Sequence, residues 1–139
     1  IMLECETASL AARRALPESL DKIEWALEKM RLSSNSPGDF LEADLEFHLL
    51  IARATGNSLL DSLVHLTRSY LHEWIKGSLA EPTVRHRLYR SSLSCEQHVE
   101  MLLYLRSSEP ESARETMHHH ILSSSEDLRK HLEGKLAES

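Results

Sequence analysis

Two side chains that could bind a metal ion, Asp44 and His48, stand four residues apart in the segment DFLEADLEFHLLIARAT. Residues at this spacing lie on the same face of an α-helix, about 6 Å apart at their Cβ atoms. Phe40, Phe47 and Ile51 share that face, so we predict that the pair points into an apolar core and not into water. A carboxylate and an imidazole held together in such a place are suitable ligands for a divalent metal ion.

Two further histidines lie on apolar helical faces elsewhere in the chain. His98 is followed at i+3, i+4 and i+7 by Met and Leu residues, and His120 is preceded at i−3 by Met117 and at i−7 by Ala113. One carboxylate and three imidazoles from three helices could therefore converge inside a bundle: Asp44, His48, His98 and His120. This ligand set suits Zn²⁺ or Ni²⁺, with Mn²⁺ and Fe²⁺ as alternatives.

Each of these residues also has an ordinary interpretation. An Asp and a His at i, i+4 commonly form a helix-surface pair, and a lone His among leucines is commonly a hydrogen-bonded core residue. Residues 118–120 are all histidines, but successive helical residues face different directions, and the phase of Ala113 and Met117 selects only His120. We interpret the remaining histidines as surface or rim residues and both cysteines as reduced core thiols. These residues are His65, His72, His86, His131, Cys5 and Cys95.

Short breaks divide the chain into about six predicted helices. Pro17 ends a first helical run that starts near Met2, and it is itself suited to begin a second helix. Residues 33–38 (SSNSPG) form a loop by composition. After this loop we expect Asp39, with a glutamate three residues on, to cap a third helix that reaches Thr55.

The second half of the chain continues the helical pattern. Gly56 is suited to end the third helix and Asn57 to start the fourth, which carries apolar residues at helical spacing: Leu60, Leu63, Leu66, Tyr70 and Trp74. We expect residues 77–82 to break this helix, a fifth helix to run from about Thr83 to Arg106, and a last helix from Pro110 to about Leu132. The inward faces of all six helices are then committed to one core. The predicted fold is an all-α antiparallel bundle of about six helices with a metal site in its core.

Composition and charge narrow the class of protein. With 139 residues, 41% of them hydrophobic and 27% charged, the chain fits one globular domain. The formal net charge of −6 does not indicate the positively charged surface with which proteins bind nucleic acid. We find no apolar run of the ~20 residues that span a bilayer and no signal peptide, so we expect a cytoplasmic protein without a membrane segment.

The motifs of the chain resemble those of one family. Residues 44–57, DLEFHLLIARATGN, are similar to the D-x-x-F-H-x-x-I-A-x-A-T-G-N signature of the FCD domain, the C-terminal ligand-binding domain of FadR-type regulators in the GntR superfamily. Residues 3–12 resemble the opening helix of that family, Glu96-Gln97-His98 its E-H motif, and residues 113–120 its A-x-x-x-M-x-x-H motif. The resemblance covers essentially the whole chain, with the motifs in the same order, so we interpret residues 1–139 as one FCD-type domain.

The resemblance implies a ligand set and a set of partners. In the metal-binding branch of the family, four residues ligate the metal, and they match Asp44, His48, His98 and His120. The resemblance also implies a homodimer, a small carboxylate effector, and DNA contacts made by an N-terminal winged helix-turn-helix domain. Nothing in residues 1–139 resembles such a DNA-binding domain, so we expect the chain to be a piece of a longer regulator.

The sequence does not determine which cationic residue pairs with the effector. An arginine that often precedes the Leu-Glu pair in the family would fall before Ile1. Arg13, Arg68 and Arg106, from neighbouring helices, are the candidates for the effector-binding role.

Three functions are compatible with these residues. In the first, four protein ligands leave one or two positions on the metal for an effector carboxylate, and the domain is a sensor without catalytic activity. In the second, a metal-dependent hydrolase, the metal activates water; that chemistry usually needs a general base, and we find no unassigned inward carboxylate. In the third, the site is closed at four ligands and purely structural.

Overall fold

The computed structural model describes residues 2–33, 35–78 and 84–138, and within them the side chains of residues 3–33, 35–74, 76 and 95–124. The described residues form six α-helices and no strand. The helices are α1 Met2–Arg14, α2 Pro17–Leu32, α3 Pro37–Ala54, α4 Ser58–Ser78, α5 Val84–Arg106 and α6 Pro110–Glu138. The all-α bundle expected from the sequence is therefore confirmed.

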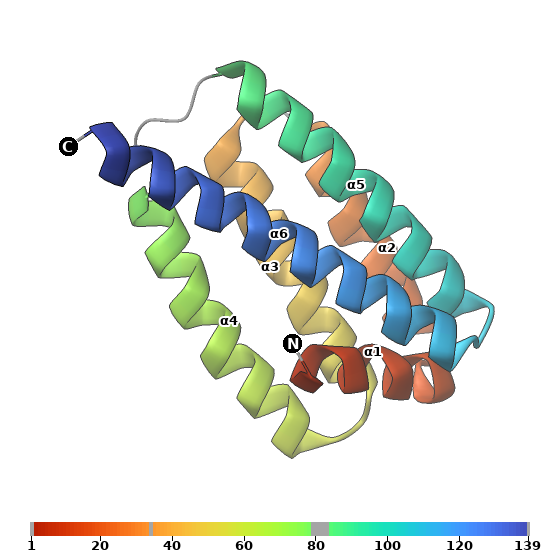
Figure 1. The fold of residues 1–139 in the computed structure, drawn as a ribbon. Coiled ribbons are helices and arrows are strands. Elements are labelled where there is room, and N and C mark those ends of the chain that lie inside the picture. The colour runs from red at the N-terminus through yellow and green to blue at the C-terminus, as the bar shows by residue number, and fades with distance from the viewer. Residues whose placement is uncertain (1, 34, 79–83, 139) are drawn as a thin grey trace.

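Helix α3 lies at the centre of the bundle and packs against α1, α2 and α4, while α6 packs against α1 and α5. In Figure 1, α6 crosses over α3, with α4 along one side and α5 and α2 along the other. One hydrophobic core joins α1, α2, α3, α5 and α6. Several of its large members are less than 3% exposed: Ile23, Met30, Phe47, Ile51, Met101, Leu105 and Met117. The inward faces of α3, α5 and α6 thus border the same interior.

Proline and turn residues set most helix ends where the sequence predicts them. Pro17 and Pro110 begin α2 and α6, because proline fits the first helical turn, where its missing N–H is not needed. Gly56 has a positive φ of 68°, a conformation that glycine adopts without strain and that commonly ends a helix. Asn57 accepts hydrogen bonds from the backbone N–H of Leu59 at 3.0 Å and of Leu60 at 3.2 Å, which is the predicted cap.

Two predicted helix ends are wrong. Helix α3 starts at Pro37 with Ser36 as the preceding residue, so Asp39 lies in the first turn and does not cap it; Ser36 Oγ donates to Asp39 Oδ2 at 2.9 Å. A proline at the first helical position outweighed the capping pattern. Helix α4 ends at Ser78, inside the predicted break of residues 77–82, whereas α6 extends beyond Leu132 to Glu138.

Helix α4 is rotated relative to the expectation that its large apolar residues face the core. Four of those five residues are exposed: Leu63 39%, Leu66 70%, Tyr70 79% and Trp74 42%. The inward face instead carries Val64, which is fully buried, with the polar residues Arg68 and His72 beneath the surface. Both polar side chains contact carboxylates, which offsets the cost of burying them. Among the described helices, none has the length and apolar character that crossing a membrane requires.

The packing predicts a clear difference between two substitutions. Ile23 is 0% exposed in the core, so Ile23→Ala should lower the free energy of unfolding by about 2–5 kcal/mol. Leu103 is 59% exposed on α5, so Leu103→Ala should change it by only about 0.5 kcal/mol. Urea denaturation followed by circular dichroism measures both, and losses of equal size would contradict the packing described here.

Candidate metal centre

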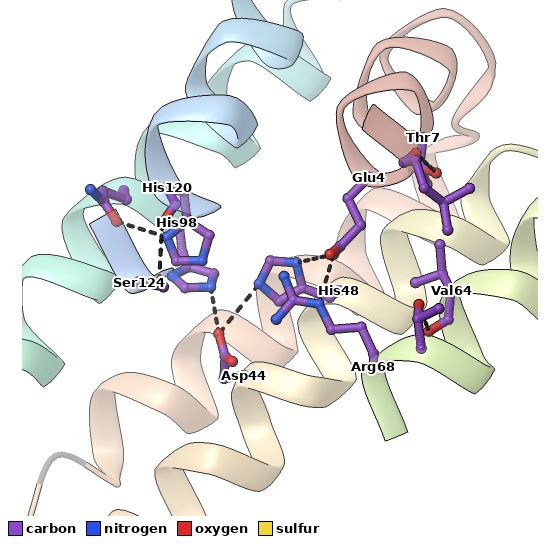
Figure 2. A network of polar contacts seen from close by, with 12 residues as sticks. Glu4, Thr7, Asp44, His48, Val64, Arg68, His98, His120 and Ser124 are labelled. Atoms are coloured by element: carbon purple, nitrogen blue, oxygen red, sulfur yellow. Dashed lines mark hydrogen bonds and ion pairs between the residues drawn. The ribbon is translucent and has the colours of Figure 1, made fainter. Parts of the chain in front are cut away.

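All four predicted ligands meet in the interior of the bundle (Figure 2). Asp44 and His48 come from α3, His98 from α5 and His120 from α6. One potential ligand atom from each residue lies within 4.8 Å of the other three. The imidazoles of His48, His98 and His120 are 5% exposed or less, so the cluster lies in the core.

The distances within the cluster are close to those of a coordination sphere. Asp44 Oδ1 lies 2.8 Å from His98 Nε2 and 3.4 Å from His48 Nε2. The rings of His48 and His120 are stacked with centroids 5.2 Å apart, and those of His98 and His120 meet edge to face at 4.4 Å. Ligand atoms bound tetrahedrally at about 2.1 Å to one ion lie about 3.4 Å apart, so the most distant ligand atoms would have to approach one another by about 1 Å or more to complete the sphere.

The chemistry of the unsatisfied atoms fits a divalent cation. Asp44 Oδ1 and both ring nitrogens of His48 are buried and make no well-directed hydrogen bond within the described part of the chain. Polar atoms in such a position are costly unless a partner satisfies them. An ion with one oxygen and three nitrogen ligands would satisfy Asp44 Oδ1 and His48 Nε2, while His48 Nδ1 faces Glu4. The residues present therefore fit a metal of the Zn²⁺, Ni²⁺, Mn²⁺ or Fe²⁺ class.

Glu4 is an inward carboxylate that the sequence interpretation missed. Its Oε1 lies 3.2 Å from His48 Nδ1 and accepts a hydrogen bond of 2.7 Å from Arg68 Nε, so it joins α1 to both α3 and α4. A carboxylate on the outer nitrogen of a ligating histidine fixes the ring and leaves the other nitrogen for the metal. The helical phase could have found it, because Ala8 and Ala11, at i+4 and i+7 from Glu4, are fully buried.

Gln97 holds His120 in the corresponding way. Its Oε1 lies 2.7 Å from His120 Nδ1. A proton on Nδ1 that is donated to this oxygen leaves the Nε2 lone pair of His120 free for a metal. The sequence contains no clear signal that Gln97 orients His120, because Gln97 stands out there only as the neighbour of His98.

Opposite charges determine the protonation of Asp44 and His48. Burial by itself raises the pKa of Asp44, but the charge of His48 and the close contacts of both His48 and His98 hold it well below its ordinary value. Burial and the charge of Arg68 lower the pKa of His48, but Asp44 and Glu4 outweigh them and raise it above the usual histidine value. In the metal-free protein, Asp44 and Glu4 thus favour the protonated form of His48.

The pKa values of Glu4 and His120, which also contact the cluster, are both lowered. Burial would raise the pKa of Glu4, but His48 and Arg68 lower it to about 2, so Glu4 is a fixed anion at neutral pH. Burial, together with the nearby His98 and His48, lowers the pKa of His120 well below its usual value. His120 is therefore neutral and available as a ligand.

The other histidines lie outside the cluster. His118 and His119 are exposed, as the helical phase predicts, and His65 is half-buried beside Asp61. His72, expected at the surface or rim, is instead buried, with Nε2 2.9 Å from Glu42 Oε1; the rotation of α4 brings it inward. The side chains of His86 and His131 lie outside the described residues.

The cysteines and the candidate arginines have distinct surroundings. Cys5 is buried and Cys95 half-buried, both are free thiols, and burial raises the pKa of each. Arg13 is exposed, and Arg106 forms ion pairs on the surface with two acidic residues of α2. Arg68 is mostly buried and is linked to the cluster through Glu4.

Comparison with known proteins identifies the family of the chain. The model of the FCD domain family matches residues 1–123. The chain belongs to the FCD domain family. Relatives of this FCD domain include the HTH-type transcriptional repressor NanR of Cronobacter sakazakii, 24% identical over 121 residues, which are 87% of this chain and 45% of NanR. The Uxu operon transcriptional regulator of Escherichia coli K12 is 42% identical over 64 residues, covering 45% of this chain and 25% of the regulator.

Solved structures share the fold of this FCD domain. A GntR protein of Streptococcus agalactiae superimposes with a TM-score of 0.75 and 26% identity, over 91% of this chain and 54% of its own. The E. coli protein McbR/YncC superimposes with a TM-score of 0.80 at 14% identity, over 93% of this chain and 63% of its own, a likeness of fold alone. The chain spans about half the length of the curated regulators that it matches over most of its own length.

Substituting single histidines should distinguish metal ligands from histidines that do not bind the metal. We expect about one divalent ion per chain after reconstitution, measured by elemental analysis. His98→Ala or His120→Ala should weaken metal affinity by more than about 100-fold, because even the loss of a residue that only orients a ligand costs about 10- to 100-fold. His118→Ala, an exposed neighbour on α6, should change it less than about 3-fold on the same scale. Equal losses from all three variants would contradict the site.

Metal affinity should fall as the pH falls. Asp44 and Glu4 raise the pKa of His48 and so favour a proton there that the metal must displace. As the pH is lowered, the metal affinity should therefore start to decrease at a pH higher than about 6.5, the usual pKa of a histidine. Proton release follows from the same displacement, and calorimetric titration in buffers of different ionisation enthalpy measures it. An affinity that stays constant between about pH 8 and pH 5 would show that no histidine loses a proton on binding.

Proposed function

We propose that this FCD domain is the effector-binding part of a GntR-type transcription regulator and that it senses a small carboxylate through a bound divalent metal. The observation that carries the proposal is the convergence of Asp44, His48, His98 and His120 within 4.8 Å in the core. The relatives NanR and the Uxu operon regulator are transcription regulators, and NanR is a repressor of the helix-turn-helix type. DNA contacts would belong to such a separate domain, consistent with the net charge of −6 on this one.

A divalent ion in this cluster would supply one or two further coordination positions for a carboxylate. The protein's contribution is the surrounding charge. Arg68 is the nearby cation, with only 13% of its side chain exposed, and its Nε is engaged by Glu4 at 2.7 Å. A carboxylate effector entering the site would compete with Glu4 for this guanidinium, because both offer the same acceptor geometry.

This competition links effector binding to the arrangement of the helices. Glu4 belongs to α1, Arg68 to α4 and His48 to α3, so the Glu4 carboxylate holds three helices together at one point (Figure 2). Replacing Glu4 at Arg68 by an effector would loosen α1 from α4. Such a change transmits a signal only if the effector binds the two arrangements with different affinity.

A hydrolase is the weaker alternative. Glu4 supplies the inward carboxylate that the sequence interpretation did not find, but it is engaged by Arg68 and its pKa is lowered to about 2. A general base works best when its pKa lies near the working pH, so Glu4 is poorly suited to activate water. We therefore expect small organic acids to be bound and recovered unchanged, which NMR spectroscopy of the ligand would test.

The arginine variants test the sensor directly. In the metal-loaded domain, small organic acids such as citrate should raise the melting temperature, and the metal-free domain should show no such shift. Arg68→Ala should weaken the binding of the same acid by about 10- to 100-fold, the loss expected for a charge-assisted hydrogen bond. The control Arg106→Ala removes a cation that pairs only on the surface with Asp21 and Glu24, and it should leave acid binding unchanged.

Two results would count against the proposal. Thermal shifts of the same size with and without metal would separate acid binding from the cluster. A loss of affinity in Arg106→Ala and not in Arg68→Ala would place the anion site elsewhere on the domain.

A further inference from the structure

Two of the candidate ligand histidines, His48 and His120, differ in the charge of the group that faces their outer nitrogen. His48 Nδ1 lies 3.2 Å from a carboxylate oxygen of Glu4, whereas His120 Nδ1 lies 2.7 Å from the amide oxygen of Gln97. A carboxylate in this position makes the imidazole more basic and therefore a stronger donor to a metal. A neutral amide fixes the ring in the same way, but its hydrogen bond to the ring is weaker because it carries no charge.

The contacts of Gln97 define which of its amide atoms faces the histidine. Its Nε2 donates to Ser123 Oγ at 3.5 Å, and its Oε1 is turned toward His120. A carbonyl oxygen can only accept a hydrogen bond, so His120 Nδ1 carries the proton and Nε2 carries the lone pair. Because His120 is only 5% exposed, this contact and not bulk water determines the tautomer.

We propose that Gln97 is a positioning residue that keeps His120 a weaker metal ligand than His48 and thereby leaves the bound ion more attractive to an effector carboxylate. An ion that receives less negative charge from its surroundings attracts an added anion more strongly. The neutral side chain at position 97 thus lowers the affinity for the metal and raises the affinity of the loaded site for an anion. The effector part of this proposal rests on the function proposed above, whereas the tautomer of His120 does not.

The first experiment determines the tautomer of His120 in the metal-free domain by NMR spectroscopy of ¹⁵N-labelled histidine at neutral pH. We expect the wild-type ring to carry its proton on Nδ1. Gln97→Leu should reduce this preference while the helical circular dichroism is retained, because leucine offers no acceptor. A wild-type ring protonated on Nε2, or a tautomer that is the same in Gln97→Leu, would overturn the proposal.

The second experiment measures Zn²⁺ affinity by competition with a chelator at about pH 7.5, where an added glutamate is ionised. Gln97→Glu should raise the affinity about 10-fold and Gln97→Leu should lower it about 10-fold, the size expected for the partner of a ligating histidine. The control Leu122→Glu adds the same charge on α6, at a leucine 43% exposed. It should change the affinity less than about 3-fold, because it faces away from His120 and is screened by solvent.

The third experiment titrates the Zn²⁺-loaded domains with acetate, a probe that binds free Zn²⁺ only weakly, and follows binding by NMR spectroscopy. Gln97→Glu should bind acetate several-fold more weakly than the wild type although it binds the metal more tightly. Simple damage to the fold would instead weaken both.

The outcomes separate this proposal from the one on which it rests. A Gln97→Glu variant whose Zn²⁺ affinity is unchanged or lower, or one that binds both Zn²⁺ and acetate more tightly, would overturn the role of Gln97. A wild-type domain that binds Zn²⁺ but no acetate would overturn the sensor function and the effector part of this proposal. The tautomer and the Zn²⁺ affinities would then still decide whether Gln97 sets the strength of His120 as a ligand.

Discussion

The burial of one carboxylate and three imidazoles in a helical core is the constraint on which the rest of this structure depends. A buried carboxylate is strongly unfavourable unless positive charge compensates it. In the metal-free protein, a proton on His48 would provide that charge, and Asp44 and Glu4 favour it because they raise the pKa of His48. A divalent ion would provide the same compensation with stronger bonds to all four ligands. The cluster is thus suited to exchange a proton for a metal without rearrangement of the bundle.

The same constraint accounts for the position of α4. Arg68 points inward because Glu4 needs a cation, and Glu4 points inward because His48 needs an anion at its second nitrogen. Once Arg68 occupies the inner face of α4, the larger apolar residues of that helix lie on its outer face, where Leu66 is 70% exposed. One helix therefore carries the cation of the proposed effector site on its inner side and exposed leucines on its outer side.

Most helix ends and all four candidate metal ligands could be predicted from the sequence, because they depend on residues that are close together in the chain. Pro17, Pro110, Gly56 and Asn57 act through backbone geometry and hydrogen bonds within a few residues. The ligands follow from helical phase, since each lies on the same face as residues that are plainly apolar, and the family signature in residues 44–57 selects the same positions.

The wrong predictions concern side chains whose orientation depends on residues far away in the sequence. The orientation of α4 depends on a contact between Arg68 and Glu4, which are 64 residues apart in the sequence, and an apolar stripe alone indicated the opposite face. His72 is buried for the same reason. Glu4 was overlooked because a glutamate near the start of a helix is commonly exposed to solvent, and only its contacts with His48 and Arg68 show that it is not.

The most direct test of the central claim is anomalous diffraction from crystals of the metal-loaded domain, recorded at the absorption edge of the bound metal. We expect one strong peak per chain in the bundle core, about 2.0–2.2 Å from one oxygen of Asp44 and one nitrogen each of His48, His98 and His120. A peak only at surface histidines such as His118 and His119, or no peak in a fully occupied crystal, would contradict it.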